Sequence, residues 1–111
     1  MIRLHALITG SSEGLGKSFA LELAVMKIPL VLVALPNTGL PQLSLYIKRN
    51  FEVPVVYFEM DLTDTDSYAT LFQSLQAQDI QVNILINNAG IGNWSLFEEK
   101  SIHFYKKQIE L

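Results

Sequence analysis

The feature that most constrains the fold is a glycine-rich segment directly after the first apolar run. Residues 4–9 are largely apolar, Gly10 ends the run, and Gly14 and Gly16 open a segment with helical spacing. A glycine turn between a strand and a helix leaves backbone N–H groups that can bind a phosphate. The segment therefore predicts a strand-turn-helix unit, the repeating unit of parallel α/β folds.

The rest of the chain repeats this alternation of apolar runs and helical segments. Continuous apolar strands are typical of a parallel sheet covered by helices on both faces. Right-handed crossovers leave few topologies, and we expect the strand order 3-2-1-4 of a doubly wound sheet. The predicted strands are residues 4–9, 30–34, 53–60 and 82–86, and the predicted helices are residues 14–26, 40–50, a segment around 68–75, and 98–111.

Apolar residues at helical spacing predict which face of each helix is buried. On the first helix these residues are Leu15, Phe19, Leu23 and Met26. On the later helices they are Leu40, Leu43 and Ile47, then Tyr68, Leu71, Phe72 and Leu75, then Ile102, Tyr105 and Ile109. We expect each of these faces to pack on a neighbouring element.

Composition narrows the class of protein. The 111 residues are half apolar and 17% charged, with a net charge of −3 and no cysteine. This predicts one core-forming domain, no nucleic-acid or membrane partner, and neither disulfides nor thiolate metal sites. We expect no metal site of another kind. No apolar run approaches the ~20 residues of a membrane span, and the first strand leaves no room for a signal peptide, so we expect a cytoplasmic protein.

The three glycines have separate physical roles. Gly10 lets the chain turn out of the strand, Gly14 lets a ligand lie against the backbone, and Gly16 lets the helix pack close to the sheet. The positive end of the helix favours a pyrophosphate. A tight turn that binds no ligand is the alternative, because short glycine motifs are not specific.

Three motifs together resemble those of the short-chain dehydrogenase/reductase family. They are Thr9-Gly10-x3-Gly14-x-Gly16, Asp61-Leu62 and Asn87-Asn88-Ala89-Gly90. Their order, spacing and positions at strand ends match, although the chain covers only about the first half of a typical member. The resemblance implies a three-layer, Rossmann-like doubly wound α/β fold, truncated after the fourth strand and following helix. It also implies that residues 1–111 are one partial NAD(P)-binding domain.

The resemblance gives eleven residues a role in binding NAD or NADP. It implies a pyrophosphate turn, an acceptor for the adenine amino group, and a wall beside the adenosine and ribose. The turn comprises Gly10, Ser11, Ser12, Gly14, Leu15 and Gly16, the acceptor is Asp61 with Leu62 beside the ring, and the wall is Asn88, Ala89 and Gly90. The alternatives are that Asp61 only caps the turn before the third helix and that residues 87–90 are purely structural.

The end of the second predicted strand has neither the residue typical of an NAD site nor the residue typical of an NADP site. An NAD site usually places Asp or Glu there, and an NADP site places Arg nearby, whereas this chain has Leu35 followed by Pro36. A carboxylate at Glu13 would disfavour a 2′-phosphate. Lys17 is a candidate compensating charge, although a solvated helix lysine is the simpler interpretation. The sequence leaves the preference between NAD and NADP open.

The catalytic residues of this family do not occur in these 111 residues. Its chemistry needs a Tyr followed four residues later by a Lys, which lowers the pKa of the phenol. The four tyrosines are followed at that distance by Asn50, Asp61, Phe72 and Ile109. The family's Ser lies further along, and its helix-borne Asn falls at or just past Leu111. The implied parent reaction is hydride transfer between a nicotinamide cofactor and an alcohol or carbonyl, and we expect no turnover from this chain alone.

Two other functions fit the same residues. One is a non-catalytic NAD(P)-binding module, and the other is a self-associating interaction protein with a vestigial site. The fourth predicted strand would be a sheet edge with open backbone groups. We therefore expect a homo-oligomer that forms through this edge or through the last helix.

Overall fold

Strands and helices alternate along the chain as the apolar pattern predicts. A computed structural model describes residues 3–63 and 65–88, and the predicted helix over residues 98–111 lies outside them. The elements are β1 (Arg3–Thr9), α1 (Gly14–Val25), β2 (Leu30–Ala34), α2 (Leu40–Phe51), β3 (Val55–Glu59), α3 (Thr65–Ala77) and β4 (Ile80–Asn87). The third strand is shorter than predicted at both ends, and the fourth is longer at both ends.

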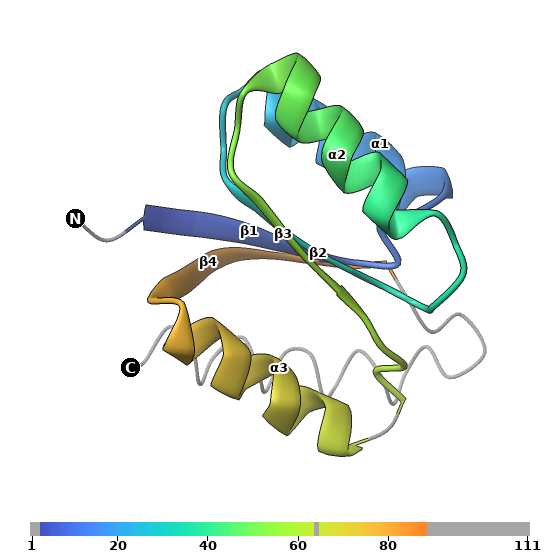
Figure 1. Ribbon diagram of the computed structural model, residues 1–111, viewed down its shortest axis with the longest axis vertical. Coiled ribbons are helices and arrows are strands. Elements are labelled where there is room, and N and C mark those ends of the chain that lie inside the picture. Colours follow the sequence, from blue (N-terminus) through green and yellow to red (C-terminus); the bar gives the residue numbers. More distant parts are fainter. Residues whose placement is uncertain (1–2, 64, 89–111) are drawn as a thin grey trace.

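The four strands form one parallel sheet in the order β3-β2-β1-β4, so the predicted topology is confirmed. On β1, Leu7 pairs with Val31 of β2 on one side and with Leu85 of β4 on the other. Figure 1 shows α1 and α2 on one face of the sheet and α3 on the opposite face. Because all strands run in the same direction, their carboxyl ends meet at one edge, where the glycine turn lies.

The core has two parts, one on each face of the sheet. Alternate residues of a strand point to opposite faces, so Ala6 and Ile8 of β1 pack under α1 and α2, whereas Leu7 packs toward α3. All five residues of β2 are buried. Burial on both faces explains why this strand is a continuous apolar run and not an alternating one.

The buried face of α1 is not the predicted one. Leu15, Phe19 and Met26 are exposed, Leu15 at 66% and Met26 at 65%, whereas Gly16, Ala20 and Ala24 are buried. Of the four predicted residues, Leu23 packs partly buried against the core. Small residues at this spacing let the helix axis approach the sheet closely, and larger side chains would hold it away. The prediction was wrong because it ranked faces by hydrophobicity, while the packing of α1 is decided by side-chain size.

The faces of the other two described helices match the prediction. Leu40, Leu43 and Ile47 of α2 are buried against β2 and β3. Leu71 and Leu75 of α3 are buried on the opposite face of the sheet, and Tyr68 and Phe72 pack partly buried against the same cluster. Within residues 3–63 and 65–88, no helix has the length and apolar character needed to cross a bilayer.

Candidate functional site

A cleft of about 640 Å³ lies at the carboxyl edge of the sheet. It is bordered by the glycine turn, the end of β2 with the loop behind it, the segment after β3, and the end of β4. Its lining residues are Gly10, Ser12, Glu13, Gly14, Leu15, Val33, Ala34, Leu35, Thr38, Met60, Asp61, Leu62, Thr63 and Asn88. Three sequence motifs separated by up to 78 positions thus meet at one concave surface.

The cleft contains most of the residues that the sequence singles out. Seven of the eleven predicted cofactor-binding residues line it, namely Gly10, Ser12, Gly14, Leu15, Asp61, Leu62 and Asn88. Ser11 and Gly16 lie behind this lining, and Ala89 and Gly90 fall outside the described residues. The structure thereby brings the glycine turn, the Asp61 segment and Asn88 together, as one shared site requires.

Ser11 and Gly16 support the glycine turn from inside the fold. Ser11 is fully buried, and both its backbone N–H and its hydroxyl donate to the carbonyl oxygen of Val33, each at 3.2 Å. A Cβ on Gly16 would lie 2.8 Å from the Gly10 carbonyl carbon, and closer still to its oxygen. The turn is therefore tied to β2 and is in direct contact with the first turn of α1.

The ends of β1 and β4 are joined by the hydroxyl of Thr9. This hydroxyl donates to Asn87 Oδ1 at 2.8 Å and accepts from the backbone N–H of Asn88 at 3.0 Å. Thr9 is 3% exposed, so these bonds form away from bulk water, where a polar group without a partner is costly. The bridge fixes the position of Asn88 beside the glycine turn.

Asp61 is held by a local turn and faces solvent. Its Oδ1 accepts from the Thr63 hydroxyl at 2.7 Å and from the Thr63 backbone N–H at 3.0 Å. The hydroxyl bond first, and the backbone bond second, hold the pKa of Asp61 below its ordinary value of 3.8, against a smaller opposing effect of desolvation. Asp61 thus makes the local turn contacts expected of a capping residue, which was the alternative to cofactor binding. The same carboxylate also lines the cleft.

We expect Thr63→Ala to raise the pKa of Asp61 back toward 3.8, because it removes the stronger of the two hydrogen bonds. Thr63→Ser keeps a hydroxyl and should leave the pKa low. Since the folded-state pKa is the depressed one, the bond stabilises the fold above pH 3.8 and its contribution is lost as the pH falls through the folded pKa. An NMR titration of the Asp61 side-chain carboxyl carbon measures this, and equal pKa values in both variants would contradict it.

Several lining residues were not among the predicted cofactor-binding residues. Met60 and Thr63 flank the Asp61-Leu62 motif, and they line the cleft because they are its neighbours in the chain. Thr38 belongs to the turn after β2, where its hydroxyl donates to the Leu35 carbonyl oxygen at 2.7 Å. A search of the loop about 20 residues beyond the glycine turn would have found Thr38, since that region meets the ribose in dinucleotide-binding folds.

Comparison with known proteins gives consistent matches over most of the chain. The family profile described as short chain dehydrogenase matches residues 4–111. The NADP-dependent 3-hydroxy acid dehydrogenase of Schizosaccharomyces pombe is 36% identical over 86 residues, which cover 77% of this chain and 33% of that protein.

Solved structures of two similar proteins carry NADPH. L-sorbose reductase from Gluconobacter frateurii, complexed with NADPH and L-sorbose, is 31% identical with a TM-score of 0.73, and the match covers 80% of this chain and 34% of that one. A short-chain dehydrogenase from Sphingobium yanoikuyae in complex with NADPH is 36% identical with a TM-score of 0.68, over 78% of this chain and 33% of that one. The chain spans about a third of the length of the relatives it matches.

Proposed function

The chain belongs to the short-chain dehydrogenase family, and from that premise we propose that its described residues form the adenine-nucleotide side of an NAD(P)-binding site. The observation that carries the proposal is that the glycine turn, the Asp61 segment and Asn88 line one cleft. Doubly wound folds bind ligands at this carboxyl edge, where the strand order reverses. In the order β3-β2-β1-β4 the reversal lies between β1 and β4.

The glycine turn is proposed to hold the pyrophosphate. α1 begins at Gly14, and its N-cap residue Glu13 makes no side-chain capping bond. The first N–H groups of a helix have no partner within the helix and attract anions. Gly10, Ser12, Gly14 and Leu15 would meet the ligand directly, whereas Ser11 and Gly16 keep the turn in place.

The remaining residues are proposed to hold the adenosine. Asp61 would accept a hydrogen bond from the adenine amino group through its carboxylate, which is ionised at neutral pH because its pKa lies below 3.8. Leu62 is buried and would pack beside the ring. Asn88, and with it Ala89 and Gly90, would lie along the adenosine and ribose.

The chemistry proposed for the whole protein is hydride transfer between NAD or NADP and an alcohol or carbonyl. The cofactor, when bound, supplies the hydride chemistry, and the protein supplies position and a proton. No tyrosine among the 111 residues has a lysine four residues later, so we propose that residues 1–111 are a partial domain that binds and orients the dinucleotide without turnover of its own.

An interaction protein that forms homo-oligomers is the second candidate. Within the described residues, β4 is paired on one side only, with β1. An open strand edge offers N–H and C=O groups to a second chain. This function would need no nucleotide in the cleft.

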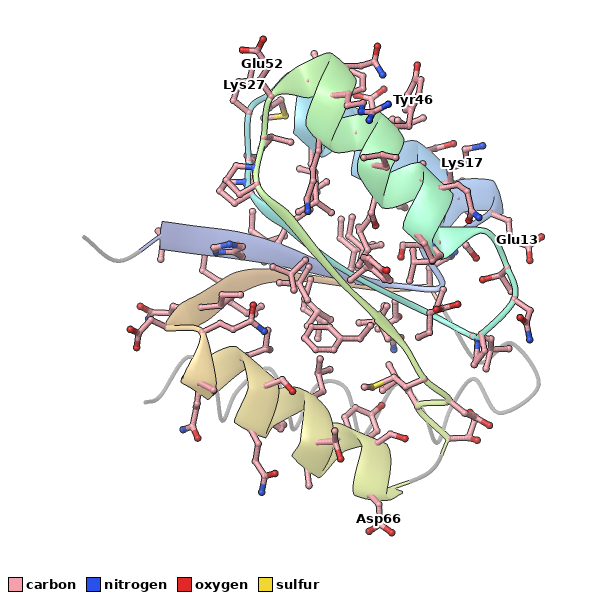
Figure 2. The ribbon with its side chains drawn as sticks, in the orientation of Figure 1. Glu13, Lys17, Lys27, Tyr46, Glu52 and Asp66 are labelled. Carbon is pink, nitrogen blue, oxygen red and sulfur yellow. The ribbon has the colours of Figure 1, made fainter. Side chains whose placement is uncertain are left out.

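Calorimetric titration of the folded chain with NADH and with NADPH tests the proposal. We expect binding at micromolar to sub-millimolar affinity, weakened about tenfold or more by Asp61→Ala, because a hydrogen bond to a charged group is lost. Asp66→Ala is the matched control, since Asp66 is exposed on the first turn of α3 and outside the cleft lining (Figure 2). Folded protein that binds neither dinucleotide and sediments as a stable dimer would favour the interaction protein.

A further inference from the structure

We propose that this cleft selects a dinucleotide with a free ribose 2′-hydroxyl and discriminates against a ribose 2′-phosphate. The inference rests on the proposed function and adds a preference that the sequence motifs leave open. It follows from which side chains share one end of the cleft and from their charges.

The 2′-position of the ribose can be located by the spacing of the chain. In dinucleotide-binding α/β folds, residues about 20 positions beyond the glycine turn meet this part of the ribose. In this chain that region is the loop after β2, from which Leu35 and Thr38 line the cleft. Glu13, the residue before α1, lines the same cleft and lies at the end of the helix beside this loop (Figure 2).

The charged side chains described at this cleft are negative. Among the described lining residues, the ionisable side chains are Glu13 and Asp61, and none is a lysine or arginine. A phosphomonoester adds about two negative charges at neutral pH. Two carboxylates that share a cleft with such a group oppose its binding, and a neutral hydroxyl has no such penalty.

A third carboxylate lies next to the same loop. Glu59, at the end of β3, accepts a hydrogen bond from the backbone N–H of Asn37 through Oε2 at 3.3 Å. Glu59 is exposed, so its field is partly screened by water and salt. The negative charge of Glu59 nevertheless adds to the negative charges of Glu13 and Asp61.

The loop after β2, residues 35–39, contains no lysine or arginine that could pair with a 2′-phosphate. Leu35 is 54% exposed and presents an apolar side chain at the end of β2. Lys17 lies one turn further along α1, where it is exposed and not part of the cleft lining (Figure 2). A solvated lysine beyond the lining does not offset a carboxylate within it.

The loop does offer a group suited to a neutral hydroxyl. Thr38 donates its hydroxyl hydrogen to the Leu35 carbonyl oxygen, and a hydroxyl that donates in this way keeps lone pairs that can accept. A ribose 2′-hydroxyl can donate to such an oxygen, and a phosphate cannot. The preference therefore departs from the two NADPH-bound relatives described above.

The test is equilibrium titration of the full chain with NADH and NADPH, repeated with AMP and adenosine 2′,5′-bisphosphate as probes of the adenosine half alone. We expect NADH to bind at least about tenfold more tightly than NADPH, from repulsion of two charges at short range. Glu13→Gln should tighten NADPH about threefold or more relative to NADH, because NADPH carries the additional phosphate that the removed carboxylate repels. Both the preference for NADH and the effect of Glu13→Gln are measured as binding affinities, so the test needs no turnover.

Glu22→Gln is the matched control, since it removes the same charge from an exposed position on α1 outside the cleft lining. Glu13 and Leu35 are both exposed, so Glu13→Lys combined with Leu35→Arg should fold normally and reverse the preference. NADPH binding as tight as NADH binding, or an unchanged ratio in Glu13→Gln, would overturn this inference and leave the proposed function intact. Failure of the folded wild type to bind any of the four probes would overturn the proposed function, and the preference with it.

Discussion

Gly16→Ala is expected to destabilise the fold by about 3 kcal/mol or more, because the added Cβ overpacks a contact that cannot relax. The atoms in its way are the carbonyl group of Gly10, which is backbone, and Asn88 Nδ2 at 3.0 Å. Relief requires α1 to move away from the sheet. Since Gly10 and Asn88 line the cleft, the same movement should weaken nucleotide binding.

Urea unfolding followed by circular dichroism measures this effect as a shift of the midpoint at an unchanged slope. Two further variants give values with which the effect of Gly16→Ala is compared. Ser18→Ala changes an exposed position on the same helix and should stay within about 0.5 kcal/mol of the wild type. Gly14→Ala has open space for its Cβ but a φ of +59°, so it should cost about 1–2 kcal/mol from strain. Gly16→Ala with a smaller effect than Gly14→Ala would show that α1 is not in close contact with the turn.

Thr9→Val is expected to destabilise the fold by about 2–4 kcal/mol, because two hydrogen bonds of a buried hydroxyl are lost without a change of shape. Valine keeps the β-branched volume that suits the strand but neither donates to Asn87 nor accepts from Asn88. The carboxyl ends of β1 and β4 then lose these two hydrogen bonds. Asn88 is expected to shift relative to the glycine turn, which also lowers nucleotide affinity.

Amide hydrogen exchange distinguishes this mechanism from a general loss of stability. In the wild type the Asn88 N–H is bonded to the Thr9 hydroxyl, and it should exchange slowly. It should exchange much faster in Thr9→Val under conditions in which the core of β2 remains protected. Thr9→Ser keeps the hydroxyl and should retain slow exchange at Asn88. Unchanged exchange in Thr9→Val would mean that this bond does not hold the turn.

The candidate site was predictable to the extent that its residues follow strand ends. Asp61 follows β3 and Asn88 follows β4, and the carboxyl ends of parallel strands meet at one edge. Strand order and direction therefore suffice to bring these residues to the cleft. Thr38 and Met60 were not predicted because the sequence motifs look for a charged residue after β2 and for Asp61-Leu62 after β3. The place of Thr38 and Met60 in the lining depends on how the loops fold over the edge.

The alternation of elements and the order β3-β2-β1-β4 were determined by the sequence alone, because apolar periodicity is local and the handedness of crossovers leaves few topologies. The tertiary structure decided which face of α1 is buried, since the contact between Gly16 and Gly10 depends on backbone distance and not on hydrophobicity. It also decided the bridge from Thr9 to Asn87 and Asn88 and the meeting of Glu13 with Leu35 at one cleft. Thr9 is far from Asn87 and Asn88 in the chain, and Glu13 is far from Leu35. Local patterns carry no information about the distance between such side chains.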